Sequence, residues 1–320
     1  MPVTKGIMGF VDLGTAVGAG VKLRVESAGL RAVQDITAME TIDSKYDYTA
    51  YRLGPVRIEG DISFPVPATS GVMSSVVKAA ALRNSTTGQL ATLPTDVIIC
   101  YDDSIIYKYE KCRINTMSVT VNSEEAIGVT WSLIGTQRTT EATVSLHPQT
   151  SPERVLTWND ATISMANLNA VGSTVPTFVA ANVKNFSFEI NNNLTAFYGL
   201  NGSIYTVVNN IVAGKREVSG TIEAAWNGSG LQNYAYSQNT NAQRCSSNDR
   251  IKLDLTKCVG GESGTPTGST TGLAVYFNGV IFNMEDISVT NDFFMGTQAW
   301  RAYGASGTDY KALTVDGTDM

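Results

Sequence analysis

Charged residues and histidine are scarce in this sequence. Only 16% of its 320 residues are charged, whereas about a quarter is usual for soluble domains. The one histidine, His147, lies in the polar segment HPQTSPER. A lone histidine gives little support for a Ser-His-Asp triad or a multi-histidine metal site. No catalytic residue, metal ligand or cofactor is therefore predicted, and the protein is not expected to be an enzyme.

Cysteine is equally sparse. Cys100, Cys112, Cys245 and Cys258 form no C-x-x-C pair, which argues against a zinc ribbon. We expect reduced thiols in a cytosolic setting, and a disulfide between Cys245 and Cys258 stays open.

Long apolar runs and basic clusters are missing as well. No stretch approaches the ~18 apolar residues of a membrane span, and the first fourteen residues lack the apolar run of a secretory signal. The net charge is −6 and no run of Lys and Arg exceeds two residues. Proteins that bind nucleic acid without regard to sequence need clustered cations, so this class is disfavoured. The phosphate-binding pattern G-x-x-x-x-G-K-[ST] is absent too.

Alternating strand patterns are what the chain does contain, and one of them occurs twice. The segments RIEGDISF (57–64) and EVSGTIEA (217–224) both alternate apolar and polar residues around a glycine, Gly60 or Gly220. Period-two alternation predicts a strand with one buried and one solvated face. A glycine within a strand marks a bulge, a bend or a close backbone approach.

Two further matches follow in the same order. YDDSIIY (101–107) and YFNGVIF (276–282) are interpreted as hairpins, and MSVT (117–120) matches ISVT (287–290). Three matches with offsets of 160, 175 and about 170 predict two tandem repeats. We place the units at residues 1–148 and 149–320, each with one helix between its matched elements. The helix candidates are TSGVMSSVVKAAALRN (69–84) and, more weakly, GSGLQNYAYSQ (228–238).

Each unit also contains a long excursion between its opening strand and its glycine-bearing strand. The excursions cover residues 37–55 and 191–215 and are rich in aromatic residues. Aromatic side chains on such long segments favour docking against another subunit. The candidates are Tyr46, Tyr48, Tyr51, Phe197, Tyr198 and Tyr205.

The segment YTAYRLGPVRIEGDISFPV, the helix after it and the closing hairpin and strands resemble the tube fold of long-tailed bacteriophages. This fold occurs in tail tube proteins, in the tube-like domains of baseplate hubs and in the Hcp protein of type VI secretion. The resemblance implies a mainly β fold, a β-sandwich or half-barrel plus one helix per unit. It also implies rings of six domains around a channel, closed by three two-domain copies or by six subunits.

The resemblance further implies a structural component of the virion, made in the host cytoplasm, whose stacked rings let DNA pass without specific binding. Other tail proteins (baseplate, terminator, and sheath if the tail contracts) would be its partners, and no membrane is involved. One polar face has no evident local partners and could line the channel or lie outside. Its residues are Glu59, Asp61, Ser63, Glu217, Ser219, Thr221 and Glu223.

Two alternatives remain open. The chain could be a trimeric baseplate hub or tube initiator of the same virion. It could instead be a carbohydrate-binding or adhesion module with a sugar platform built from Trp131, Trp158, Trp226 and Trp300, although three of these lie on predicted strands.

Overall fold

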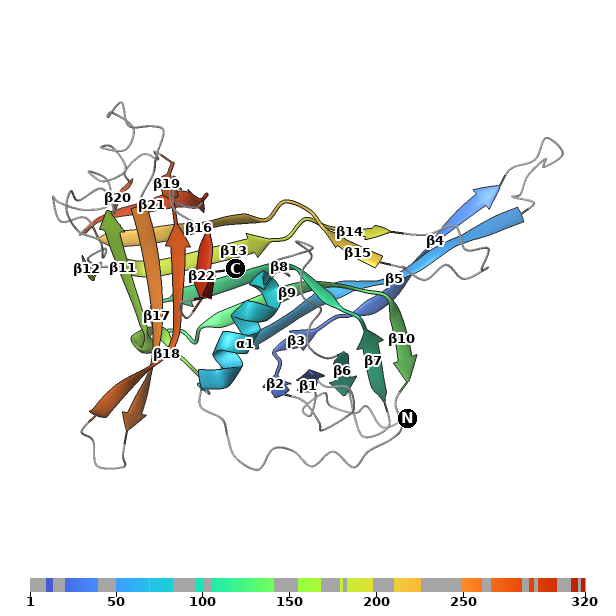
Figure 1. Cartoon of the computed structure of the whole chain (residues 1–320), viewed down its shortest axis with the longest axis horizontal. Coiled ribbons are helices and arrows are strands. Elements are labelled where there is room, and N and C mark those ends of the chain that lie inside the picture. The colour runs from blue at the N-terminus through green and yellow to red at the C-terminus, as the bar shows by residue number, and fades with distance from the viewer. Residues whose placement is uncertain are drawn as a thin grey trace.

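The structure, a computed structural model of the whole chain, is almost entirely β-sheet. It describes residues 10–13, 21–39, 50–68, 70–82, 96–100, 105–140, 155–167, 179–180, 183–197, 210–225, 249–260, 266–283, 288–290, 293–303, 312–315 and 318–319. The prediction of a mainly β fold is confirmed (Figure 1). No helix among these residues is long and apolar enough to cross a membrane.

The largest sheet of the described chain has ten strands, all paired antiparallel. Its main path is β19 (Val280–Phe282), β21 (Phe293–Ala302), β16 (Glu217–Ala225), β13 (Val183–Asn191), β8 (Arg113–Asn122), β9 (Gly128–Gly135), β5 (Ala50–Pro65) and β3 (Ser27–Ala28). Two more strands join its ends: β20 (Ser288–Thr290) pairs with β21, and β4 (Arg31–Met39) pairs with β5. This sheet includes strands from both halves of the chain.

Two smaller sheets and a two-stranded ribbon complete the β structure. One sheet contains β10 (Gln137–Thr140), β7 (Ile106–Glu110), β6 (Val97–Cys100), β1 (Phe10–Leu13) and β2 (Val21–Arg24). The other contains β12 (Val179–Ala180), β11 (Ala161–Asn167), β17 (Asp249–Gly260), β18 (Pro266–Asn278), β22 (Leu313–Val315) and β23 (Thr318–Asp319). The ribbon pairs β14 (Leu194–Phe197) with β15 (Asn210–Ala213).

The core lies between these layers and continues from one half of the chain to the other. On β5 the alternation predicted from sequence places Ile58, Ile62 and Phe64 in the interior. They belong to one cluster of buried side chains that also contains Phe186 and Phe277 from the second half. Burial of apolar surface is the main force that holds the layers together.

The first predicted helix is confirmed as α1 (Ser70–Ala81). It contributes Val76, Val77 and Ala80 to the core and contacts β8, β18 and β22. A short 3-10 helix, η1 (Trp158–Asp160), follows the junction of the halves. The second helix candidate, residues 228–238, lies outside the described residues.

Both repeated glycines lie where a neighbouring strand comes too close for a side chain. Gly60 has a φ of 149°, and a Cβ there would lie 2.2 Å from the carbonyl oxygen of Gly29. A Cβ at Gly220 would lie 2.1 Å from the carbonyl oxygen of Ser187 and 2.5 Å from the ring of Trp300. Close backbone approach is therefore the reason for the glycine in each strand.

The strands that carry the sequence matches have the same neighbours in the same order. In the first half the order is β4-β5-β9-β8, and in the second it is β13-β16-β21-β20. The two tryptophans are not placed alike, however. Trp131 lies opposite Ile62, whereas Trp300 lies opposite Gly220. Both indoles are buried, so neither belongs to a sugar platform.

One of the two predicted hairpins is wrong. β6 and β7 do pair, with Cys100 opposite Ile106, although residues 101–104 are outside the described part. By contrast, β18 pairs with β17 and β22 while β19 pairs with β21. Because both edges of β18 are already occupied, the chain turns at Gly279, with φ of 63°, and enters another sheet.

Candidate assembly surfaces

The polar residues predicted on β5 and β16 share one face of the ten-stranded sheet, which we call the polar face. The face continues across the intervening strands, because residues directly opposite each other in a sheet point to the same side. Asp61, for example, lies opposite Ser132, and Thr221 lies opposite Ser187. The members are Glu59, Asp61, Ser63, Thr130, Ser132, Thr116, Ser118, Thr120, Ser187, Glu189, Glu217, Ser219, Thr221 and Glu223.

The expectation that these residues lack local partners is wrong for several of them. The hydroxyl of Ser63 forms a hydrogen bond with that of Thr130 at 3.0 Å. The hydroxyl of Thr221 forms one with that of Ser187 at 2.7 Å. Glu223 accepts a hydrogen bond from the side-chain amide of Asn185 and lies 3.9 Å from the Lys184 ammonium. Cross-strand pairing supplies these contacts, and sequence spacing along one strand cannot reveal it.

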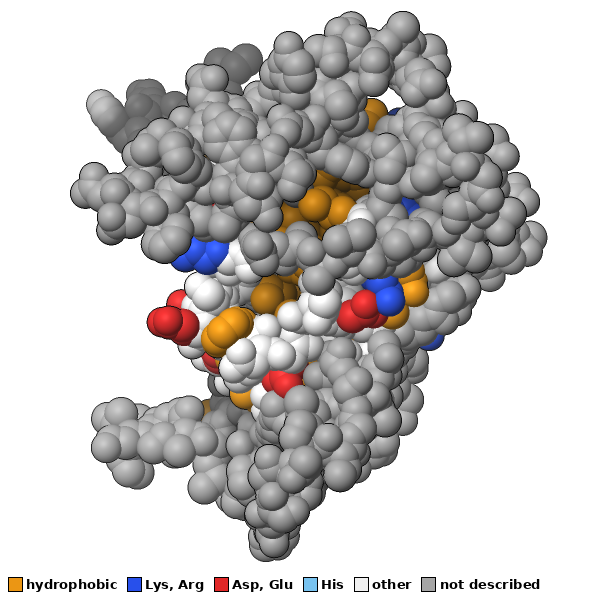
Figure 2. All heavy atoms as spheres, turned by 90° about the vertical axis from the view of Figure 1, so that its left-hand side faces the viewer, with side chains coloured by type: hydrophobic (Ala, Val, Ile, Leu, Met, Phe, Trp, Pro, Cys, Tyr) orange, Lys and Arg blue, Asp and Glu red, His pale blue; other side chains and the backbone are white. Residues whose placement is uncertain are grey.

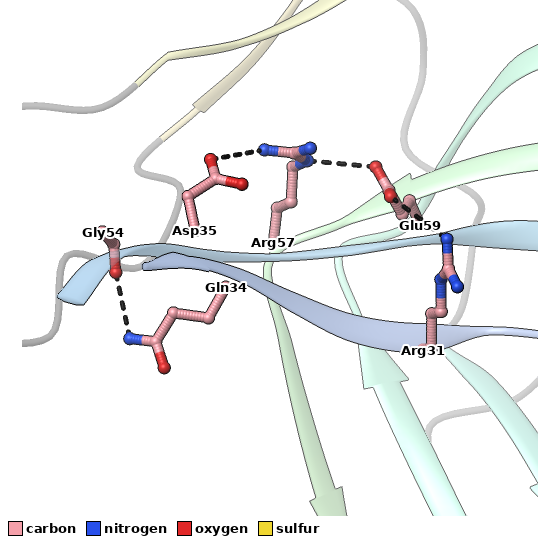
Figure 3. Close-up of polar contacts among 6 residues, drawn as sticks. All are labelled: Arg31, Gln34, Asp35, Gly54, Arg57 and Glu59. Carbon is pink, nitrogen blue, oxygen red and sulfur yellow. Dashed lines mark hydrogen bonds and ion pairs between the residues drawn. The ribbon is translucent and has the colours of Figure 1, made fainter. Parts of the chain in front are cut away.

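Glu59 belongs to a chain of ion pairs on the β4–β5 ribbon (Figure 3). Arg57 donates from Nε to Glu59 at 3.0 Å and from Nη1 to Asp35 at 3.2 Å, and Arg31 lies 3.9 Å from Glu59. These side chains are partly exposed, so each pair contributes only about 0–1 kcal/mol. Their main consequence is that the cations of this region are already matched to carboxylates.

The surface charge of the described residues is mixed. The polar face carries the carboxylates Glu59, Asp61, Glu189, Glu217 and Glu223. The arginines next to Glu59, and Arg301 opposite Ser219, offset part of that charge. Among the described residues visible in Figure 2, acidic and basic side chains are scattered and form no patch of one sign. Within the described ranges, no group of three or more potential ligands could hold a metal ion.

The two excursions predicted as loops begin as paired strands, and the structure corrects that expectation. We call residues 36–39 paired with residues 50–53 the first arm, and the β14–β15 ribbon the second arm. Both arms extend toward the same side of the molecule, the right in Figure 1. Among the predicted aromatic contacts, Tyr51 on the first arm and Phe197 on the second are exposed. Tyr46, Tyr48, Tyr198 and Tyr205 lie outside the described residues.

The two halves of the chain meet edge to edge where β8 pairs with β13, and we call this pairing the seam. It runs from Asn185 opposite Asn122 to Asn191 opposite Thr116. Eight strands of the ordered path therefore form one continuous surface across the seam. The seam joins residues that are distant in sequence, which is why no local pattern indicates it.

Asn192, which the sequence analysis did not single out, holds the end of the seam. Its side chain is fully buried and donates to the carbonyl oxygens of Ala80 at 2.8 Å and Ile114 at 3.0 Å. Arg216 donates to the carbonyl oxygen of Ala81 at 2.7 Å. Both residues thus bind the carboxyl end of α1, where orphan carbonyls need donors. The run NNN at 191–193 resembles a polar turn and hides this role.

β8 also holds the second arm. The Arg113 guanidinium donates to the carbonyl oxygen of Ile211, and burial lowers the pKa of Arg113. The backbone amide of Leu194 donates to the Asn115 side chain at 2.8 Å.

Next to β8, Cys112 is a free, buried thiol whose pKa is raised by burial and, secondarily, by the charge of Asp96. A protonated, enclosed thiol fits a core role better than a reactive one.

The sheet ends at two strand edges with no strand partner among the described residues. One is the outer edge of β3 and β4, and the other is the edge formed by β19 and β20, which both pair with β21. On the first edge the carbonyl oxygen of Leu30 accepts a hydrogen bond from the Tyr109 hydroxyl at 2.9 Å. Open strand edges are ready templates for pairing with another chain.

A family model described as "Phage tail tube protein" matches residues 11–256 of this chain. The match begins in β1 and ends in β17, so it includes both arms, the seam and both glycine-bearing strands. No curated protein gives a significant match to the chain.

Proposed function

Because the chain belongs to the phage tail tube protein family, we propose that three copies close into a ring and that stacked rings form the inner tube of a phage tail. A tail tube protein is a structural component of the virion tail. The proposed role is mechanical and requires no chemical step or cofactor. Each ring would consist of six units, two per copy, divided near residues 1–148 and 149–320.

The seam carries this proposal. Within one copy, β8, at one edge of the strands from the first unit, pairs with β13, at the facing edge of the strands from the second unit. The remaining edges belong to the corresponding strands: β19 and β20 together match β8, and the β3–β4 strand matches β13. Repeating the seam between copies pairs these edges, so that no edge of the ten-stranded sheet stays open among the described strands. Three copies close the ring by one type of contact.

The seam also predicts the register between copies. Within the chain, Ser118 lies opposite Glu189 and Val119 opposite Phe188. Ser118 corresponds to Ser288 in the repeated tripeptide SVT. Glu189 lies opposite Ser219, the residue before Gly220. Arg31 lies opposite Glu59, the residue before Gly60, so Arg31 corresponds to Glu189. The sequence match therefore predicts Ser288 of one copy opposite Arg31 of the next. The strand pairing within the sheet predicts a register shifted by two residues, because Ser118 is level with Ser63 whereas Ser288 is level with Ala225.

We further propose that the polar face lines the channel. Its opposite side packs into the core, so among the described residues the polar face is the side of this sheet that can face solvent. Carboxylates repel phosphates, and hydroxyls bind them weakly and without sequence preference. Such a lining would let DNA pass without adhering.

Assembly tests the proposal directly. The purified protein should form rings or tubes with pseudo-sixfold projections in negative-stain micrographs, at a mass of three copies per ring. Six copies per ring would favour a hexamer, and a monomer at high concentration would contradict the proposal. In virions, tens to hundreds of copies are expected, whereas a baseplate hub would be present in three or six.

The register has its own test. The double variant Ser288→Cys with Arg31→Cys should form an intermolecular disulfide on mild oxidation, since directly opposed residues lie within reach. Each single variant is the control and should remain monomeric in denaturing gels. Equal cross-linking at residue pairs shifted by two positions would refute this register.

A further inference from the structure

The two arms begin with the same backbone arrangement. In the first arm Ile36 lies opposite Leu53. Asp35 comes just before Ile36 in the chain, and Gly54 comes just after Leu53. In the second arm Leu194 lies opposite Ala213. Asn193 comes just before Leu194 in the chain, and Gly214 comes just after Ala213. A Cβ on Gly54 would lie 2.9 Å from the carbonyl oxygen of Asp35, and one on Gly214 would lie 2.8 Å from that of Asn193. The arms can therefore be compared position by position.

This comparison identifies corresponding faces. On the first arm, Ile36, Ala38, Tyr51 and Leu53 share one face, because Ile36 is opposite Leu53 and Ala38 is opposite Tyr51. The corresponding residues of the second arm are Leu194, Ala196, Ile211 and Ala213. Both faces are apolar, although the residue types differ.

The two faces differ in what covers them. On the second arm, Ile211 is only 2% exposed, and its three neighbours on that face are half-buried. Arg113 and Asn115 of β8 bind the backbone of this arm, so a strand of the other half of the chain lies against it. β8 is also the strand that pairs with β13 in the seam.

On the first arm the corresponding face is open. Ile36 is 67% exposed, Tyr51 71% and Leu53 37%. Contiguous exposed apolar side chains of this kind mark interaction sites. The β3–β4 strand that leads into this arm pairs on one side only, with β5, among the described residues. The second arm lies against β8, the strand beside β13. Among the described residues, no strand of the same copy has this place beside the β3–β4 strand.

We propose that the apolar face of the first arm is buried by a second copy of this chain within the same ring. The neighbour's edge strands β19 and β20, which together have the place of β8 in their unit, form the covering surface. The inference rests on the proposed ring and adds that this face makes a lateral contact. Its alternative is a contact between stacked rings.

The double variant Ile36→Thr with Leu53→Thr tests this proposal. Threonine keeps the β-branched shape that favours a strand but removes apolar surface. Because both side chains are exposed in the single copy, circular dichroism and thermal unfolding of the monomer should remain unchanged. We expect the concentration for half-maximal ring formation, followed by sedimentation velocity, to rise at least about tenfold. The matched control is Val212→Thr on the exposed side of the second arm, which should form rings normally.

The outcomes separate the alternatives. Rings that form normally but fail to stack would assign the face to contacts between rings and overturn the inference, while the proposed tube function stands. Normal tubes would overturn it as well. If the wild-type protein forms no rings, the proposed function itself fails.

A measurement on the wild-type protein is independent of any variant. Hydroxyl-radical footprinting of monomers and of single rings should show protection of Ile36, Tyr51 and Leu53 when the ring closes. Protection that develops only when rings stack would contradict the lateral contact.

Discussion

At the residue scale, the two glycines are defined by what surrounds them. Gly60 and Gly220 lie in corresponding strands, and each faces a backbone carbonyl oxygen at a distance that excludes a Cβ. Any side chain would push β5 away from β3 and β4, or β16 away from β13. These strands form the edge and the seam, so local strain there would reach the assembly surfaces.

We predict that Gly60→Ala and Gly220→Ala each lower the free energy of unfolding by about 1–3 kcal/mol, because the backbone must shift to admit a methyl group. Chemical denaturation of the soluble subunit measures this change. Gly296→Ala is the control, since a Cβ there meets no atom within 4 Å. Equal stability of all three variants would show that the close approach is relaxed in solution.

At the scale of elements, the seam depends on how β13 ends. Asn192 joins the carboxyl end of α1 to the start of β8, so one side chain fixes a helix, a strand and the root of the second arm. Gln34 has the corresponding place at the root of the first arm. It is partly buried and donates to the carbonyl oxygen of Gly54 at 3.0 Å (Figure 3). Asn192, at the seam, therefore binds the helix and β8 of the other half, whereas Gln34, at the open edge, binds the root of its own arm.

Asn192→Ala should destabilise the isolated subunit by about 1–3 kcal/mol, because two buried carbonyl groups lose their donor. Gln34→Ala should change the stability of the subunit by less than about 0.5 kcal/mol. Thermal unfolding of both variants below the assembly concentration provides the comparison. A larger loss for Gln34→Ala than for Asn192→Ala would contradict the roles assigned to the two positions.

At the scale of the whole molecule, the ten-stranded sheet has one face in the core and one polar face. If three copies close a ring, the polar side chains of all copies form one continuous lining. The five carboxylates on this surface outnumber its arginines Arg31, Arg57 and Arg301, which offset much of the acidic charge, and Lys184 lies 3.9 Å from Glu223. The expected result is weak repulsion of DNA.

Reversing the exposed charges with Asp61→Lys and Glu217→Lys should leave ring assembly intact and slow DNA release from the virion. The added cations would bind phosphates, so the defect should weaken as salt is raised. Release kinetics at several salt concentrations measure this effect. The neutral pair Asp61→Asn with Glu217→Gln is the control. Unchanged release by the lysine variant would place the polar face outside the channel.

The sequence by itself determined the strand content, α1, the two glycines and the division of β5 and β16 into buried and polar faces. These features are local, because alternation of apolar and polar residues along one strand already specifies which side faces the core. The mistaken hairpin at residues 276–282 shows the limit of such patterns. Two adjacent strands can be recognised locally, but whether they pair depends on which other strands occupy their edges.

Only the tertiary structure decided the seam between β8 and β13, the paired strands of the arms and the burial of Ile211 against the exposure of Tyr51. Each of these features joins residues that are far apart in the chain. Their energy comes from contacts across strands and layers, which leave no periodic signal in either segment alone.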